Sequence, residues 1–314
     1  MTPETWDAII IGGGTAGLSA AQMLGRARRR TLVIDAGDPR NRFAEHMHGV
    51  LGHDGKTPAE LLEIGRREAR AYGVTVEPGR VVGVADLGER LEVEFDTGRR
   101  DTARALLLAT GVSDDLPDIP GMREQWGTGV LHCPYCHGFE VAGRRLGVLA
   151  TSPAGIHQIE LVRQWTDDLT AFTAAAEPLD AAVRERLDAR GIRIVDSPAT
   201  ALTTAAGVLS GLTTADGAHH PLDALFTAPV PRLRVDHVAA LDLARSDQPG
   251  SPLAADALGA TSHPRVWAAG NLVAPYGNVP LSMGQGSFAG AAINAALVME
   301  DAARAAAARR SAAG

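Results

Sequence analysis

Hydrophobic positions in the first part of the chain fall into short continuous runs separated by segments with helical spacing. The first apolar run covers residues 6–11, and the letters GGGTAG and an Ala- and Leu-rich segment to about Arg26 follow it. A second run, TLVID, covers residues 31–35. Short apolar runs bounded by turn residues are typical of buried parallel strands. The pattern therefore predicts a strand–helix–strand unit at the start of the chain.

The same alternation continues along the chain and indicates an α/β protein with a second, smaller α/β block. Up to residue 114 it predicts a helix at 58–72, short strands within 74–95 and a buried strand at 105–111. In the second block it predicts strands at 146–151, 169–173 and 192–195, and helices at 156–165 and 181–190. A strand that meets a turn at 266–271 and a small-residue helix at 284–299, extended by an Ala- and Arg-rich tail, complete the pattern.

Composition narrows the classes of protein that the chain can represent. Of its 314 residues 45% are hydrophobic and 21% are charged, and the net charge is −7. A nucleic-acid-binding protein would show a basic balance, so none is expected as a partner. No apolar run is long enough to predict a membrane span, and the N-terminal letters lack the basic start of a secretory signal. We therefore expect a cytoplasmic protein with no membrane partner.

The glycine-rich turn after the first strand predicts a dinucleotide site. Gly12, Gly14 and Gly17 have the G-x-G-x-x-G spacing between a strand and a helix, and Asp35 ends the following strand. Such a turn lets the backbone approach a pyrophosphate, whose charge the helix N-terminus stabilises. The acidic residue accepts hydrogen bonds from ribose hydroxyls and would repel a 2′-phosphate. The site therefore suits FAD or NAD rather than NADP.

The second chemical motif is the cysteine pair in LHCPYCHGFE. Cys133 and Cys136 are the only cysteines, too few for a disulfide framework in a chain of this size. Two thiols at this spacing can form a redox-active disulfide, and a helix N-terminus lowers the pKa of a thiol. His137, next to the second cysteine, can accept or donate a proton near neutral pH.

The motif has three other interpretations. C-x-x-C-H is also the attachment signature of c-type haem, which needs an exported apoprotein. A zinc site needs two further ligands, and neither a second C-x-x-C nor an H-x₃₋₅-H motif exists, so no metal is expected. The cysteines could also be inert core residues. The dinucleotide turn upstream favours the redox interpretation over all three.

Together GGGTAG, Asp35, ALLLATG, the C-x-x-C motif and VWAAGN resemble, in order and spacing, the low-molecular-weight thioredoxin reductases. The resemblance covers nearly the whole chain. It implies two Rossmann-like three-layer α/β domains and a homodimer. The FAD domain would be discontinuous, at residues 1–114 and 233–314, and a central NADPH-type domain with the cysteines would occupy residues 115–232.

The resemblance also implies roles for individual residues. Cys136 would face the flavin, and Cys133 would exchange with the substrate. Asn271 occupies the position of the Asp that binds the ribityl chain or pyrophosphate, and an Asn can still accept a hydrogen bond. A helix N-terminus following Asn278 and Val279 would face the flavin N1–C2=O region. The expected FAD site comprises Gly12, Gly14, Thr15, Ala16, Gly17, Asp35, Ala36, Asn41, Val82, Thr110, Gly111, Gly270, Asn271, Asn278 and Val279.

Two departures from the family pattern bear on function. In the family an acidic residue follows the C-x-x-C motif, whereas His137 does so here. CPYCHG is similar to the motif of the gliotoxin- and holomycin-type dithiol oxidases, a branch that closes disulfides in small natural products.

The second departure is in the predicted nucleotide turn of the central domain. The turn reads ATSPAG, with Ala150 and Ser152 where glycines should be, and the next strand, LTAFTAAAEPL, lacks arginine. The Cβ atoms would crowd a pyrophosphate, and a 2′-phosphate would find no cation. This predicts that the domain keeps its fold and has lost ordinary NADPH binding. A divergent turn that still binds nicotinamide is the alternative.

The remaining histidines give weaker predictions. By resemblance, His46 and His48 lie in a loop that passes near the flavin, where either could assist proton transfer from a dithiol. Each could equally be an ordinary loop histidine. Residues His219, His220, His237 and His263 are expected at the surface or in loops.

Three functions remain open from the sequence. The first is an FAD-dependent dithiol oxidase that forms a disulfide in a small dithiol, with oxygen or another acceptor. The second is a thioredoxin reductase-like enzyme that acts on a thioredoxin-like protein and takes electrons from NADPH or ferredoxin. The third is a flavoprotein without turnover that serves as a redox-responsive regulatory module.

Overall fold

A computed structural model of the chain describes residues 4–176 and 178–313. The chain divides into two compact units. The first contains residues 1–42, 58–113 and 231–314, and the second contains residues 43–57 and 114–230. Each unit has its own hydrophobic cores, so each is described by itself.

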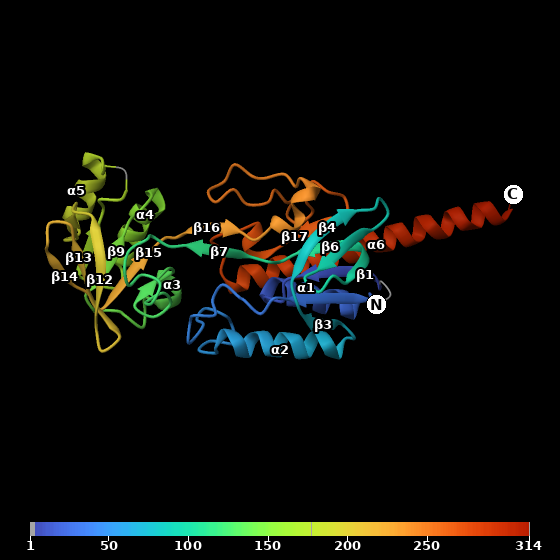
Figure 1. Ribbon diagram of the computed structural model, residues 1–314, viewed down its shortest axis with the longest axis horizontal. Helices are drawn as coiled ribbons and strands as arrows, with labels where there is room; N and C mark the ends of the chain where they lie inside the picture. The colour runs from blue at the N-terminus through green and yellow to red at the C-terminus, as the bar shows by residue number, and fades with distance from the viewer. Residues whose placement is uncertain (1–3, 177, 314) are drawn as a thin grey trace. The chain divides into compact units, whose positions relative to one another are not determined.

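The first unit is built on a parallel sheet with an antiparallel extension (Figure 1). β1 (Thr5–Ile11) lies between β2 (Thr31–Asp35) and β6 (Arg100–Leu108), and all of these pairings are parallel. β3 (Thr75–Pro78) pairs with β2, and β17 (Val266–Ala268) pairs with β6. β5 (Leu91–Phe95) and β4 (Val81–Asp86) continue from β6 as antiparallel strands.

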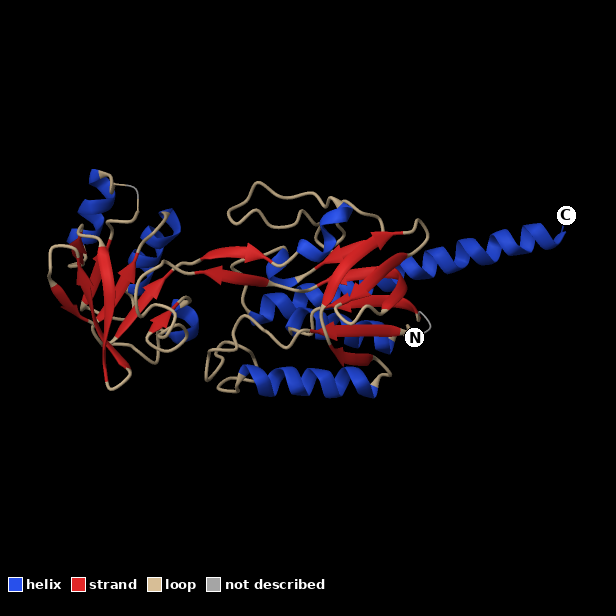
Figure 2. Ribbon diagram, viewed as in Figure 1, coloured by secondary structure: helices blue, strands red, loops and turns tan. Residues whose placement is uncertain are grey.

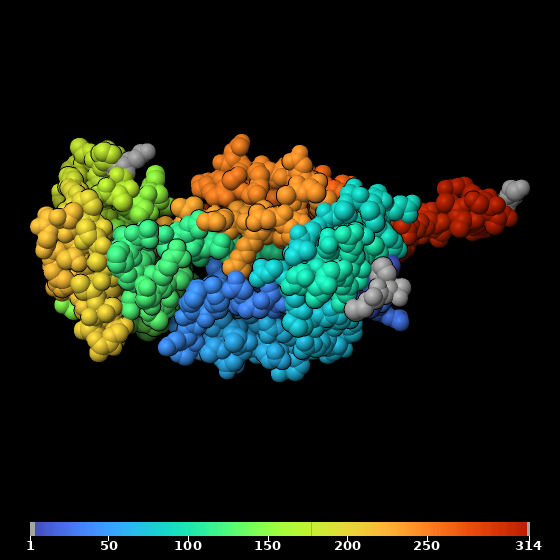
Figure 3. All heavy atoms as spheres, in the orientation of Figure 1, coloured from blue at the N-terminus to red at the C-terminus, as the bar shows by residue number. Residues whose placement is uncertain are grey.

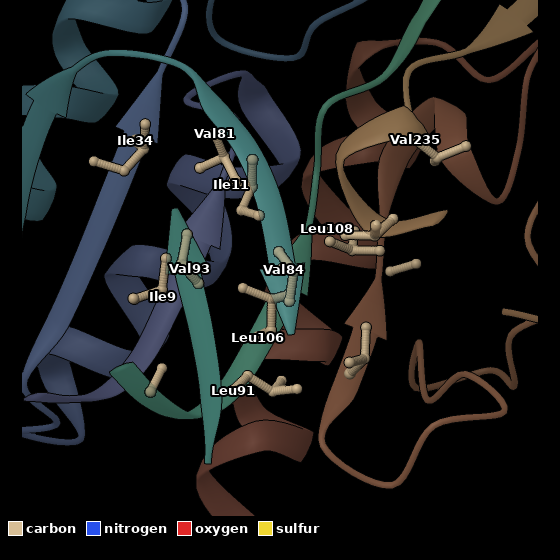
Figure 4. Packing of buried hydrophobic residues seen from close by; sticks show 14 of the residues in the cluster. Ile9, Ile11, Ile34, Val81, Val84, Leu91, Val93, Leu106, Leu108 and Val235 are labelled. Atoms are coloured by element: carbon tan, nitrogen blue, oxygen red, sulfur yellow. The ribbon is translucent and has the colours of Figure 1, made fainter. Parts of the chain in front are cut away.

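Alternate residues of β1 belong to two different cores, which explains its continuous apolar sequence. Ile9 and Ile11 pack in a core that includes β4 and β5. Ala8 and Ile10 pack in a core formed with α1 (Thr15–Arg26) and α6 (Val279–Ala313). Figure 4 shows the first of these cores, with the side chains of Ile9, Ile11, Ile34, Val81, Val84, Leu91, Val93, Leu106, Leu108 and Val235.

The remaining elements of the first unit are α2 (Pro58–Ala71) and two short 3₁₀ helices, η1 (Asp236–Leu241) and η2 (Gly270–Leu272). The last turns of α6, residues 301–312, are exposed and project beyond the rest of the first unit (Figure 3). No helix in the described part of the chain is both long enough and apolar enough to cross a membrane.

The second unit is a parallel five-stranded sheet. Its strand order is β11 (Arg193–Val195), β10 (Leu169–Phe172), β9 (Leu146–Leu149), β15 (Ala224–Thr227) and β8 (Val130–Leu131). An antiparallel sheet of β12 (Ala199–Ala205), β13 (Val208–Thr214) and β14 (His219–Pro221) accompanies it. The helices are α3 (Pro134–His137), α4 (Pro153–Val162) and α5 (Ala181–Ala189).

Two paired strands carry the chain between the units. These are β7 (Val112–Asp115) and β16 (Val230–Leu233), seen side by side in Figure 2. The predicted fold class, two Rossmann-like α/β domains, is confirmed.

Several predicted boundaries were wrong. The last helix begins at Val279 rather than at 284, because the Asn278 side chain caps its first turn. The helix predicted from 156 begins at Pro153, since proline is well tolerated at the first helical position. The strand predicted at 105–111 runs from Arg100 to Leu108. The polar, Thr-rich strands between 199 and 221 were missed because only one of their faces is buried.

Candidate functional site

The turn between β1 and α1 forms an open cradle made of backbone. Gly12 has φ +110°, and a Cβ there would collide with the carbonyl of Ala109. A Cβ on Gly17 would collide with the carbonyl of Gly12. Around Gly14, in contrast, no atom lies within 4 Å of a Cβ position, and no side chain caps the first turn of α1. Free amides and open space at a helix N-terminus fit a pyrophosphate.

Asp35 lies against this turn at the end of β2. A Cβ on Gly13 would be 2.6 Å from the Cβ of Asp35, so the two segments are in close contact. Arg66 of α2 donates to Asp35 Oδ2 at 3.0 Å, and the Gly37 amide donates to Oδ1 at 3.1 Å. A carboxylate can accept about four hydrogen bonds, so acceptor capacity remains for ribose hydroxyls. No local pattern predicts Arg66 at this position, because it comes from a different element.

The turn after β6 is tied to the loop after β2 by Arg234. Thr110 Oγ1 donates to the Arg234 carbonyl at 2.6 Å, and the Arg234 amide donates to the Gly111 carbonyl at 3.2 Å. Its guanidinium pairs with the Asp38 carboxylate at 3.0 Å. These contacts hold two loops together at the carboxyl ends of parallel strands, where Rossmann-type folds bind ligands.

Asn271 shows why an amide rather than a carboxylate stands at this position. Its Nδ2 donates to the carbonyls of Ala274, Pro275 and Gly277 at 3.0, 3.3 and 2.9 Å. An ionised Asp has no donor for these carbonyls. Asn271 Oδ1 accepts no hydrogen bond from the described residues, so its acceptor is available to a ligand. The Gly270 amide donates to Gln285 Oε1 at 3.0 Å, which fixes the turn to α6.

All residues that the sequence assigns to the FAD site lie in the first unit. The glycine turn, Asp35, Thr110 and Gly270 follow or end four parallel strands of one sheet. Val82 lies on β4 and is 49% exposed, and the Asn278 side chain is used to cap α6 at 3.0 Å. The contact of each residue with the cofactor remains a prediction.

The cysteine motif is held by a single helical turn in the second unit. Cys133 is the N-cap of α3, and its carbonyl accepts from the amides of Cys136 and His137 at 3.1 and 3.2 Å. Gln158 of α4, only 6% exposed, donates to the His132 carbonyl at 2.5 Å. This hydrogen bond attaches the segment that leads into the motif to α4.

The two sulfur atoms lie 2.7 Å apart, and Cys136 Sγ donates to Cys133 Sγ. This hydrogen bond is the largest cause of a raised pKa for Cys136, and burial adds to it. The lower pKa expected at a helix N-terminus is therefore wrong for Cys136, because a neighbouring sulfur that competes for one proton outweighs a one-turn helix. Burial and the neighbouring Cys133 sulfur both raise the pKa of Cys136.

His137 is held neutral by its surroundings. Burial lowers its pKa, the charge of Glu140 acts in the opposite direction, and a charged His48 lowers it further. A neutral imidazole near neutral pH can accept a proton. The chemistry predicted for His137 is thus available to it, and its catalytic role remains a prediction.

The loop of residues 43–57 belongs to the same unit as the cysteine motif. In this loop the exposed His46 contacts only the Gly55 carbonyl, at 3.2 Å from Nδ1. His48 lies between two carboxylates, with Nδ1 3.4 Å from Asp54 and Nε2 3.3 Å from Glu140. Sequence reasoning missed Glu140 and Asp54, although Glu140 follows His137 at a spacing of one helical turn.

The expectation that the other histidines are ordinary surface residues was wrong for His237. This half-buried side chain has a buried Nε2 without a hydrogen bond, and burial lowers its pKa to about 4. His220 contacts the buried Phe172 edge-on, with the ring centres 5.3 Å apart. His219 and His263 bond to Thr203 and Asp86 at 3.0 and 3.3 Å.

The turn after β9 keeps one glycine of the dinucleotide pattern and has lost two. A Cβ on Gly155 would lie 2.7 Å from the Ala150 Cα, so close packing of α4 on β9 is retained. Ala150 is completely buried and has no positive φ, in contrast to Gly12. Ser152 is the N-cap of α4 and is followed directly by Pro153, which has no amide hydrogen to donate.

A small cavity of about 110 Å³ lies next to this turn, at the carboxyl ends of β9 and β10. The residues that line it carry no positive charge: Pro117, Ile119, Leu149, Thr151, Phe172, Ala174, Ala175, Ser197, Pro198 and Ala199. A 2′-phosphate placed here would meet apolar and small side chains. Among the described residues there is also no group of three His, Cys, Asp or Glu that could hold a metal ion.

Two Rossmann-like units, one with a dinucleotide cradle and one with a C-x-x-C pair, define a flavin-dependent disulfide oxidoreductase. The family model "Pyridine nucleotide-disulphide oxidoreductase" matches residues 6–296, and the chain belongs to this family of FAD-binding enzymes. The resemblance to thioredoxin reductases and their dithiol oxidase branch is confirmed by the relatives that follow.

Thioredoxin reductase sirT of Leptosphaeria maculans is 31% identical over 93% of this chain and 94% of its own. Thioredoxin reductase tcpT of Claviceps purpurea is 39% identical over 49% of each chain, so the match spans about half of that relative. Among solved structures, HlmI has a TM-score of 0.94 at 39% identity and covers 99% of this chain and 98% of its own. An oxidoreductase from Agrobacterium tumefaciens has a TM-score of 0.89 at 41% identity, covering 94% and 99%.

Proposed function

We propose that this protein is an FAD-dependent dithiol oxidase that forms a disulfide in a small dithiol substrate. Cys133 and Cys136 are the redox pair, with His137 as the proton acceptor and donor. Oxygen or another acceptor takes the electrons from the flavin. The first unit holds FAD through its glycine turn and Asp35, and the second carries a nucleotide fold that no longer binds NADPH.

The contrast between the two glycine turns is the observation that carries this proposal. The first turn has an open Gly14 and a Gly12 with positive φ. The second has Ala150 and Ser152 at the matching positions and a cavity without a cation. Losing two or more charge-assisted phosphate contacts, each worth about 1.5–3 kcal/mol, weakens binding by roughly three orders of magnitude or more.

The exchange step needs only groups of the second unit and the substrate. A substrate thiol gives its proton to His137, and the resulting thiolate attacks Cys133 of the oxidised pair. The Cys133–Cys136 bond breaks, and Cys136 takes the electron pair and a proton. The second substrate thiol then displaces Cys133, so that one substrate dithiol and the protein disulfide become a substrate disulfide and a protein dithiol. Bound FAD supplies the two-electron acceptor that reoxidises the pair.

Stopped-flow absorbance of the purified flavoprotein under nitrogen tests the proposal. Dithiothreitol should bleach the flavin band, and air should restore it. NADPH and NADH at millimolar concentration should leave the band unchanged for seconds. Rapid bleaching by micromolar NADPH would refute the oxidase, and bleaching by neither reagent would favour the regulatory module.

A thioredoxin reductase-like enzyme is the second candidate. Its support is that sirT and tcpT are both named thioredoxin reductases. In that case a thioredoxin-like protein would be the partner, and NADPH or ferredoxin would be the donor. Reduction of thioredoxin by a mixture of this protein with reduced ferredoxin or NADPH would favour this candidate.

We also propose a homodimer in the cytoplasm. The support for the dimer is the family resemblance found in the sequence, and no helix of the described residues is long and apolar enough to cross a membrane. Light scattering after size-exclusion chromatography should give twice the chain mass of 32.7 kDa. A mass of one chain at micromolar concentration would contradict the dimer.

A further inference from the structure

A set of charged side chains lies beside the redox motif but outside the roles described above. His48 has a carboxylate at each ring nitrogen, Asp54 at 3.4 Å and Glu140 at 3.3 Å. The exposed fraction of the side chain is 27% for His48, 45% for Glu140 and 69% for Asp54. His48 is therefore the most buried of the three, held between two more exposed carboxylates.

The loop that carries His48 is closed on itself by backbone hydrogen bonds. The Met47 amide donates to the Lys56 carbonyl, and the Gly55 amide donates to the Met47 carbonyl, both at 2.8 Å. Asp54 Oδ1 accepts from the Gly49 amide at 3.0 Å, which leaves Oδ2 for His48. This hydrogen bond from the Gly49 amide is also the largest cause of a lowered pKa for Asp54. His48 is thus presented by a defined loop rather than by a free side chain.

Glu140 and His48 also act on the pKa values of the groups that exchange protons. The charge of Glu140 raises the pKa of both Cys136 and His137, although in each case other causes are larger. A protonated His48 lowers the pKa of His137. Among the described residues these are the two charges that act on His137 from outside the cysteine pair, one from the turn after α3 and one from the loop of residues 43–57.

We propose that His48 and Glu140 form a positioning pair that governs proton transfer to and from His137 during dithiol exchange, with Asp54 as its solvent-side anchor. This inference rests on the proposed function for its chemistry. Each exchange removes one proton from a substrate thiol and adds one to a cysteine of the pair, so protons are neither gained nor lost overall. His48 and Glu140 contact each other and both act on the imidazole that handles these protons, and Asp54 keeps the His48 ring turned toward Glu140.

His46 provides a matched control within the same loop. It is the same type of residue, two positions away, yet among the described residues the hydrogen-bond partner of its ring is a backbone carbonyl. A role that depends on the carboxylate partners predicts an effect at His48 and none at His46. This assigns the proton-handling role left open for these two histidines to His48.

The first test follows the cysteine thiols without flavin chemistry or substrate. The rate of iodoacetamide alkylation of the dithiothreitol-reduced holoprotein, gel-filtered and kept under nitrogen, is measured between pH 5 and 10. Because Glu140 opposes the formation of a thiolate, Glu140→Gln should lower the pH midpoint by about 0.5–1 unit. Glu140→Asp, which keeps the charge, should stay within 0.2 unit of wild type. His46→Gln should match wild type.

The second test is the rate of flavin reduction by dithiothreitol under nitrogen, measured as a function of pH. At acid pH this rate falls when the proton acceptor, His137 in this proposal, becomes protonated, which gives the profile an acid limb. Glu140→Gln should move this limb to lower pH and His48→Gln to higher pH, each by about 0.5 unit. A merely structural role would reduce the rate at every pH without moving the limb. Circular dichroism and flavin content verify folding, and His48→Asn replaces His48→Gln if the latter does not fold.

The outcomes separate this inference from the proposed function. The pair would be overturned if the alkylation midpoint of Glu140→Gln stays within 0.2 unit of wild type, or if the acid limb stays within 0.2 unit of wild type in both Glu140→Gln and the His48 variant. If dithiols do not reduce the flavin, the proposed function fails, and the alkylation midpoints still decide whether Glu140 acts on the cysteines. Opposite displacements of the acid limb in the two variants would support the pair.

Discussion

At the scale of single residues, the dinucleotide turn combines two glycines that have no room for a side chain with one that has open space around it. Gly12 and Gly17 have no room for a Cβ, because backbone atoms of neighbouring segments occupy that space. Gly14 has room, and its backbone does not require a glycine conformation. We therefore expect the approach of a bound pyrophosphate to be the reason for a glycine at position 14.

Gly14→Ala should weaken FAD binding and leave the apoprotein folded. The added methyl group would stand where the pyrophosphate approaches the N-terminus of α1. The Kd for FAD should rise at least about tenfold, equivalent to about 1.4 kcal/mol, as measured by fluorescence quenching. The free energy of unfolding of the apoprotein should change by less than about 1 kcal/mol. An unchanged Kd would show that the cofactor does not lie over this turn.

The two cysteines should differ in their spectra when each is replaced. Cys136→Ser should abolish flavin reduction by thiols and keep FAD bound. Cys133→Ser removes the sulfur whose hydrogen bond raises the pKa of Cys136, so a Cys136 thiolate should form more readily. If Cys136 faces the flavin, this variant should show long-wavelength charge-transfer absorbance. The reverse pattern would exchange the roles of the two cysteines.

His237 should make the protein sensitive to mild acid. Its folded-state pKa of about 4 lies below the ordinary value of 6.5, so the unfolded chain binds a proton more readily. Its contribution is fully present above pH 6.5 and is lost as the pH falls toward 4. Between pH 7 and pH 5 urea unfolding should lose about 2 kcal/mol that is absent in His237→Gln. Equal losses in both proteins would contradict this assignment.

At the scale of elements, the first unit depends on the close approach of α1 and α6. A Cβ on Gly286 would collide with the backbone carbonyl of Ala16, and one on Gly290 would lie 2.7 Å from that of Ala20. Gly284, on the exposed side of α6, has no neighbour within 4 Å. Small residues on one side of α6 thus bring its axis close to α1 and position its capped N-terminus.

Two alanine substitutions in α6 should have opposite effects on stability. Gly286→Ala forces the helices apart and should destabilise the first unit by about 1–3 kcal/mol. Gly284→Ala meets no obstacle and should stabilise it by up to about 1 kcal/mol through helix propensity. Urea unfolding of the two variants beside wild type measures both values. Similar effects at the two positions would show that α6 does not pack on α1 in this register.

At the scale of the whole molecule, the chain builds two Rossmann-like units with separate cores. The two core clusters of the first unit contain no residue from 114–230, and the two of the second lie entirely within 116–226. Only the first unit has an open dinucleotide turn. We therefore expect FAD to stabilise the first unit and NADPH to stabilise neither unit.

Differential scanning calorimetry should show two transitions, and added FAD should raise only one of them. A ligand at 100 times its Kd stabilises the unit that binds it by about 2.7 kcal/mol. The transition assigned to residues 1–42, 58–113 and 231–314 should rise by several degrees, and the other should stay unchanged. NADPH should shift neither. One cooperative transition, or a shift caused by NADPH, would contradict this division.

Local pattern alone determined much of this protein. Continuous apolar runs predicted the central parallel strands, because strands buried on both faces need apolar residues at every position. The spacing of Gly12, Gly14 and Gly17 before a helix, with Asp35 after it, predicted the cofactor class, since backbone geometry and charge are encoded locally. The order of motifs along the chain identified the family and the likeness to its dithiol oxidase branch.

Only the tertiary structure decided which distant residues act on one another. Arg66 at Asp35, Arg234 between two loops and Glu140 beside His48 come from elements far apart in sequence, so no local pattern reveals them. The raised pKa of Cys136 and the lowered pKa of His237 depend on burial and on neighbouring groups, which spacing does not report. Sequence specifies which chemical groups are present, and folding sets their distances and their exposure to water, on which proton affinity depends.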